Sequence, residues 1–240
     1  MKMKILSILI PLLILPSIAM TQMFSIEDAE ERSGRSTSSI SVGPDFIDMS
    51  FRGNDDEAVQ YTWNDAVYRI RLEIPGVNAY VGYNSSIGDA DTLTYFNAGA
   101  NLQAGTPLIA NSSYGIIIPL QIITDYVKVE STDSAQPEMD HFRQSSLAAG
   151  LGIGFYYQFQ NTIRLEVEAV PKIGFTVSAF GSDAGQIRGV SGRVRFKIDE
   201  IINRYGLVAG FDYVLRSYSG GDDLIDHNIS SNNFVIGVSF

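Results

Sequence analysis

The residues with the widest chemical repertoire gather in one short segment, DDLIDHNIS. It holds Asp222, Asp223, Asp226, His227 and Ser230. A carboxylate, an imidazole and a hydroxyl are the parts of a hydrolase site, in which histidine takes a proton from the attacking group. Residues three apart point to opposite faces of a strand, so His227 and Ser230 meet only if the segment bends. The alternative to a hydrolase site is a solvated acidic loop without catalytic function. We prefer this alternative and expect no catalytic residues here.

Metal and cofactor chemistry has little support in this sequence. His141 is the other of the two histidines, and there is no cysteine. That excludes a disulfide framework and a thiolate metal site. Acidic loops suit Ca²⁺ or Mg²⁺, which prefer carboxylate ligands, but the spacing of these acidic residues matches no calcium motif. We therefore expect no cofactor and no bound metal.

A second constellation consists of charges at every second position of several segments. Opposite charges on adjacent strands would form a paired network inside a barrel, since an unpaired buried charge is costly. The same charges would be a selectivity lining if they surrounded an open pore. The strand pattern described below predicts an eight-stranded barrel. We prefer the paired network, because the lumen of such a barrel is just wide enough for its own side chains. The candidate network consists of Arg69, Arg71, Glu73, Arg164, Glu166, Glu168, Arg193, Arg195, Lys197, Asp212 and Arg216.

The apolar pattern that holds these charges has a period of two from residue 67 onward. VYRIRLEI, for example, alternates apolar residues with Arg69, Arg71 and Glu73, which is typical of a strand with one apolar and one polar face. IDEIINRY (198–205) could form one short helical turn. The eight strands that this pattern predicts are 68–84, 93–104, 114–129, 143–159, 162–178, 186–199, 206–218 and 230–240.

A count of ten strands is the alternative. Pro75-Gly76 would split the first strand, and ISVGPDFIDMSF (40–51) could be an extra strand or a local plug. Several predicted strands exceed the about 9–11 residues that a tilted strand needs to cross a bilayer. Polar connections, such as the one at 130–142, alternate with shorter ones, such as QFQN at 158–161. Alternating short turns and long loops are typical of a transmembrane barrel.

The same alternation also fits a soluble β-sandwich or secreted barrel, with apolar rows inside and charges in water. A transmembrane barrel inverts that arrangement. Inversion is favoured by aromatic residues on the apolar rows, among them Tyr157, Phe159 and Tyr213, which suit a membrane interface. The polar rows are also rich in Gly, Ser and Ala, which suits a crowded lumen.

The N-terminus predicts export. MKMKILSILIPLLILPSIAM has two early lysines, a short apolar core broken by Pro11 and Pro16, and the small residues Ser17 and Ala19 at the positions that a signal peptidase reads. This is typical of a secretory signal peptide (1–19) cleaved after Ala19, rather than of a retained membrane anchor. The acidic, Ser-rich segment 20–66 is predicted to be a flexible extension, and the barrel is expected at 67–240. A formal net charge of -10 argues against nucleic acid as a partner.

The C-terminal segment NNFVIGVSF resembles the C-terminal signal of bacterial outer-membrane β-barrel proteins. Phe234, Ile236, Val238 and Phe240 lie at alternate positions in it. The architecture is similar to the small eight-stranded, OmpX-like class of that family. The resemblance implies an antiparallel up-and-down transmembrane β-barrel in the outer membrane of a Gram-negative cell envelope. It also implies recognition by the barrel-assembly machinery and contact with outer-membrane lipids and lipopolysaccharide.

From these features we expect a structural or surface-interaction role through the outer loops, with an extracellular ligand that the sequence does not name. A small passive, porin-like channel is the second hypothesis. A hydrolase at the outer rim, acting on lipid or peptide, is the third.

Overall fold

The computed structural model describes residues 38–52, 61–87, 93–131, 142–160, 162–176, 185–220 and 226–240. The predicted signal peptide and most of the predicted extension lie outside these ranges. Among the described residues, no helix is long and apolar enough to span a membrane. The described secondary structure is all strand: β1 Ser39–Arg52, β2 Tyr61–Ile74, β3 Val77–Ile87, β4 Leu93–Ala110, β5 Tyr114–Ser131, β6 Phe142–Leu151, β7 Ile153–Gln160, β8 Ile163–Thr176, β9 Gly185–Ile202, β10 Tyr205–Gly220 and β11 Asp226–Ser239.

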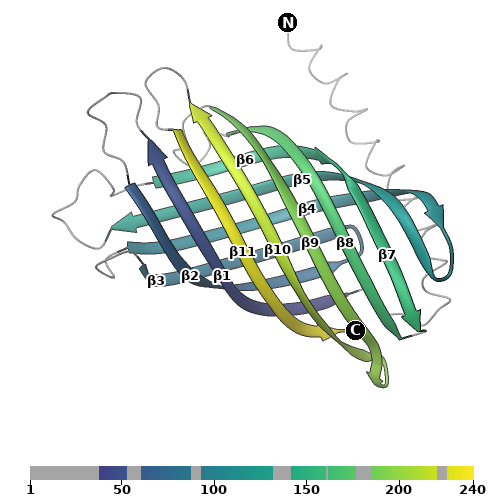
Figure 1. The fold of residues 1–240 in the computed structure, drawn as a ribbon. Helices are drawn as coiled ribbons and strands as arrows, with labels where there is room; N and C mark the ends of the chain where they lie inside the picture. The colour runs from purple at the N-terminus through teal and green to yellow at the C-terminus, as the bar shows by residue number, and fades with distance from the viewer. Residues whose placement is uncertain are drawn as a thin grey trace, which may run out of the picture. The chain divides into compact units, whose positions relative to one another are not determined.

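These strands form one antiparallel sheet that closes on itself (Figure 1). β1 pairs with both β2 and β11, while β4 pairs with both β3 and β5, so neither end of the sheet is left open. β6 and β7 both pair with β5 and β8 and are separated only at Gly152. They therefore share one position in the wall. The described strands thus give an up-and-down barrel with ten positions, and closure satisfies the backbone along every edge.

The expected count of eight is wrong, and the two additions are those of the ten-strand alternative. Pro75-Gly76 forms the turn between β2 and β3, with Gly76 at a φ of 72°, where glycine carries no steric penalty. The other addition is β1, which lies within the predicted flexible extension, so the barrel begins at Ser39 and not at residue 67.

β1 forms because its residues alternate, although Gly43-Pro44 interrupts the apolar pattern. Asp45, Ile47 and Met49 are buried, while Ile40 and Phe46 are exposed. The register with β11 is the same on both sides of Gly43-Pro44. A Cβ at position 43 would collide with the Phe234 carbonyl, so the close approach of the two strands requires glycine.

The two ends of the barrel differ in their connections. The strands joined across 53–60, 88–92, 132–141, 177–184 and 221–225 all meet at one end, which we call the loop end (Figure 1). The strands joined across 75–76, 111–113, 161–162 and 203–204 meet at the opposite end, which we call the turn end. The helical turn expected in 198–205 is wrong, because β9 continues to Ile202 and Asn203 turns the chain with a φ of 57°.

Apolar and charged side chains are distributed over the two faces of the wall in the opposite way to a soluble protein. On the outer face Tyr68 is 72% exposed, Ile173 62% and Ile236 64%, whereas Arg195 on the inner face is 1% exposed. Aromatic residues contact one another along the outer face: the ring centroids of Tyr157 and Phe159 are 4.8 Å apart. The apolar rows therefore lie outside, and the barrel interior holds the charges.

Candidate functional site

The lumen is the candidate site, because the inner rows of β2, β8, β9 and β10 carry the predicted charges. The backbone pairing of the strands alone places acidic residues opposite basic residues. Glu166 lies across from Arg195, and Glu168 lies across from Arg193. Asp212 on β10 also lies across from Arg193. Acidic and basic residues thus occupy neighbouring inward positions, where ion pairs compensate their burial.

The centre of this network joins opposite walls of the barrel. Arg195 donates from Nη2 to Glu73 Oε1 over 2.8 Å and from Nη1 to Asp212 Oδ1 over 2.9 Å. Arg71 pairs with Asp212 over 2.7 Å. β2 and β9 are separated in the sheet by β1, β11 and β10. The contact between Glu73 and Arg195 therefore crosses the lumen.

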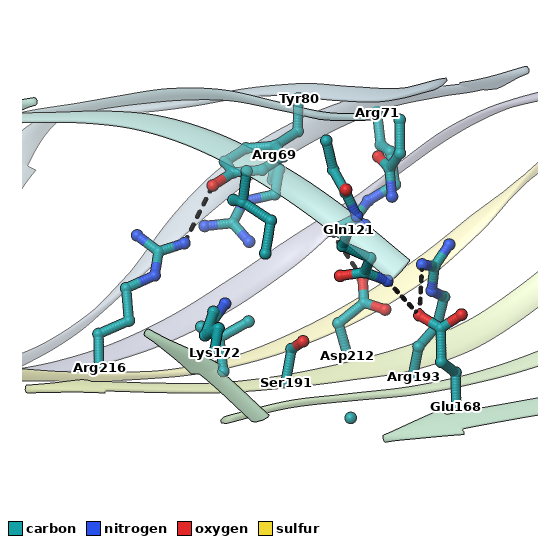
Figure 2. Close-up of a pocket in the computed structure, with 15 residues that line it drawn as sticks. Arg69, Arg71, Tyr80, Gln121, Glu168, Lys172, Ser191, Arg193, Asp212 and Arg216 are labelled. Carbon is teal, nitrogen blue, oxygen red and sulfur yellow. Dashed lines mark hydrogen bonds and ion pairs between the residues drawn. The ribbon is translucent and has the colours of Figure 1, made fainter. Parts of the chain in front are cut away.

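Glu168 anchors a second group on the other side of the lumen. It accepts from Arg193 over 2.9 Å, from Gln121 over 2.7 Å and from Gln103 over 2.6 Å. These residues come from β4, β5, β8 and β9. One carboxylate thus links four strands, with its hydrogen bonds visible as dashed lines in Figure 2 where both partners are drawn.

A smaller group lies closer to the turn end. Glu166 pairs with Lys197 over 3.1 Å and with Arg164 over 3.0 Å. All three side chains were named from the sequence. This group contains no residue of β2 and is held by the register of β8 and β9 alone.

Arg69 and Arg216 do not pair with the other predicted residues. Arg69 pairs with Asp45 over 2.5 Å, and Arg216 pairs with Asp125. Tyr80 connects the two arginines: its hydroxyl accepts from Arg216 over 3.0 Å, and Arg69 lies 4.6 Å from its ring centroid.

Sequence reasoning missed Asp45, Tyr80 and Asp125. Asp45 lies in the segment assigned to the flexible extension. Asp125 has the apolar neighbours Ile123 and Val127 on its own inward row, and all three are buried. The contrast between the two faces of β5 is therefore weak. A signal existed in the spacing of Asp45 from Ile47 and Met49, which continues the two-residue period of β1.

The inner face changes character toward the loop end. Eleven buried residues there form what we call the apolar cluster, and Ile47, Met49 and Ile87 in it have no exposed surface. Tyr218 stacks on His227 with ring centroids 4.1 Å apart. Side chains from both sides of the barrel meet here. The cluster comprises Ile47, Met49, Val67, Ile87, Leu93, Tyr95, Val127, Val129, Ile187, Tyr218 and Ile229.

A cavity of about 60 Å³ lies within the charged part of the lumen (Figure 2). Arg69, Arg71, Lys172, Arg193 and Arg216 line it, together with Glu168 and Asp212. A buried water needs about 10–15 Å³ of such space. The cavity therefore has room for a few waters or a small ion, but not for a larger solute.

The histidine-containing segment is not arranged as a hydrolase site in its described part. His227 lies on β11, on the inner face, and not in an outer loop as predicted. Ser230 lies on the opposite face of the same strand, as residues three apart must. Asp222, Asp223 and His141 lie outside the described residues.

The four residues of the C-terminal motif lie on the outer face. Phe234, Ile236, Val238 and Phe240 are 52%, 64%, 44% and 41% exposed. Phe234 packs against Phe211 on β10 and Phe46 on β1, with ring centroids 5.1 Å and 6.2 Å away. The motif thus contributes to the apolar outer surface where β11 joins β1.

No family model and no curated protein matches this chain. Among solved structures, it is similar to Ail, the attachment invasion locus protein of Yersinia pestis, with 12% identity over 86% of this chain and 99% of that chain, and a TM-score of 0.27. The CymD monoaromatic hydrocarbon channel has 9% identity over 86% and 89%, with a TM-score of 0.28. The toluene transporter TodX of Pseudomonas putida has 8% identity over 85% and 89%, with a TM-score of 0.26. Because these TM-scores are below 0.5, the similarities carry no inference about the function of this chain.

Proposed function

We propose that this chain is an outer-membrane β-barrel protein with a filled lumen, which acts in a structural or surface-interaction role at its loop end. The inverted distribution of side chains carries the proposal. Charged residues such as Arg195 and Asp45 are buried inside, while apolar residues cover the outer face.

The outer face suits lipid. Large apolar side chains are exposed on every strand position of the wall, and water would be a poor solvent for so continuous a surface. Apart from β7, the strands have 10 to 18 residues, which meets the about 9–11 needed to cross a bilayer. We therefore propose outer-membrane lipids, including lipopolysaccharide at the loop end, as the contacts of this surface.

The inner face suits a closed lumen. Ion pairs between β2 and β9 cross it in the charged part, and the apolar cluster occupies it toward the loop end. The cavity within the charged part measures only about 60 Å³. A passive channel is the second candidate, favoured by the charged lining of that cavity. With solutes excluded from the lumen, interaction would take place through the connections at the loop end.

The membrane assignment is tested by placing a charge on the outer face. Ile70→Arg, at an outward position that is 59% exposed, should destabilise the barrel in lipid vesicles by about 2–4 kcal/mol, the cost of arginine near the bilayer midplane. Ser219→Arg is the control, because it lies at the last outward position of β10 before the loop end. Its cost should be about 0–1 kcal/mol. Equal effects at the two depths, measured by urea unfolding, would contradict a lipid-facing wall.

A further inference from the structure

Lys172 differs from the other cations of the lumen. It lies on the inner row of β8, is 9% exposed, and lines the cavity (Figure 2). Its cross-strand neighbours are Gly150 on β6 and Gly189 on β9, neither of which has a side chain to offer. Within the described ranges, Lys172 takes part in no ion pair. Its ammonium group is therefore left facing the cavity.

The other cations around the cavity each have a carboxylate partner. Arg71 pairs with Asp212, and Arg193 with Glu168. Arg69 and Arg216 pair with aspartates outside the lining, Asp45 and Asp125. The lining itself contains five cations against two carboxylates. Once these partners are matched, Lys172 supplies the surplus positive charge.

The same lining also offers hydrogen-bond donors without acceptors. Arg69 Nε and Arg71 Nε are buried and make no hydrogen bond within the described part of the chain. Asn78 and Asn101 also line the cavity, and the side-chain oxygen of each is buried without a donor. The two ends of an amide are assigned from hydrogen bonds, so a turned amide would present NH₂ to the cavity instead. An acceptor in the cavity would satisfy several groups at once.

We propose that the lumen binds one small monovalent anion of the halide class beside Lys172. One surplus charge calls for one negative charge, since an uncompensated buried ammonium is costly. The volume limits the ligand to an inorganic ion of about the size of a water or two. This site goes beyond the proposed function and concerns the interior alone.

Bromide is the probe, because its anomalous scattering locates it directly. Crystals of the refolded full chain are soaked in sodium bromide. We expect an anomalous peak in contact with Lys172 Nζ, and its loss in Lys172→Met. Lys128→Met is the matched control, because Lys128 pairs with Glu130 at a partly exposed site; that variant should keep the peak. A peak confined to the outer surface, or one that persists in Lys172→Met, would overturn the proposal.

Unfolding in detergent gives a second measurement that needs no crystals. The midpoint of thermal unfolding of the wild type should rise with the logarithm of bromide concentration once that concentration exceeds the dissociation constant, as expected for a ligand that binds only the folded state. Lys172→Met and Lys172→Gln should lose the part of this rise that comes from the site, while Lys128→Met keeps it. Identical bromide responses in all four proteins would refute the site. Conductance does not enter either measurement, so failure of the anion site and failure of the filled lumen are distinguishable.

Discussion

The lumen contains two regions that stabilise the same barrel by different physics. In the charged region, Arg195 holds Glu73 and Asp212 at distances of 2.8 and 2.9 Å. In the apolar cluster, Ile47 and Met49 are fully buried among other apolar side chains. An apolar cluster tolerates substitutions that conserve its volume, whereas removal of one partner from a buried ion pair leaves an uncompensated charge. We therefore expect the charged region to be more sensitive than the apolar cluster to a single substitution.

The largest effect should follow from breaking a buried pair at the centre. Glu73→Gln leaves Arg195 and Arg193 without one of their carboxylates, and removal of one member of a buried pair costs about 3–5 kcal/mol. Urea unfolding in lipid vesicles measures this loss. Glu130→Gln is the control, because its pairs with Lys128 and Arg143 are partly exposed and worth about 0–1 kcal/mol. Similar losses of stability in the two variants would contradict the claim that central ion pairs contribute more than peripheral ones.

A smaller effect is expected in the apolar cluster. Ile47→Ala should destabilise the barrel by about 2–4 kcal/mol, because it removes methylenes from a packed site and leaves a cavity. Ile40→Ala, on the same strand but 52% exposed, should cost less. The same unfolding assay compares the two. A greater loss in Ile40→Ala would mean that the cluster contributes little to stability.

The smallest effect concerns the contact that supports the charged region. Tyr80 lies across from Gly99, and a Cβ there would be 2.5 Å from the tyrosine ring. Gly99→Ala should cost about 1–3 kcal/mol through overpacking. Adding Tyr80→Ala removes the collision, so the double variant should lose less than the sum of the single losses. If the losses of stability in the two single variants add up to the loss in the double variant, the Tyr80 ring does not collide with the new Cβ at position 99.

The fold could be predicted from the sequence wherever the two faces of a strand differ strongly. Residues 163–169 of β8 and 193–198 of β9 alternate charged and apolar side chains, and the sequence predicted both strands. β1 was not assigned, because Gly43-Pro44 interrupts its pattern and proline within a run argues against a strand. The strand exists because β2 and β11 pair with it on both sides, a tertiary effect that local sequence does not contain.

The site divides in the same way. All eleven predicted charges lie on inward rows, because alternation assigns a face without knowledge of the partner. Partners outside that list, such as Asp45 and Asp125, lie on rows that also carry apolar residues toward the loop end. On these rows the inward and outward residues differ little in polarity, so the alternation does not identify the inward face. The lone position of Lys172 depends on the glycines of two neighbouring strands, and only the register brings them together.

The central claim is that the lumen is filled, and conductance in a planar lipid bilayer tests it most directly. The refolded protein, shown to be folded by its heat-dependent gel shift, should give no steady current steps. Reproducible single-channel steps from the same preparation would contradict the claim. The charged rows would then be the selectivity lining of a pore.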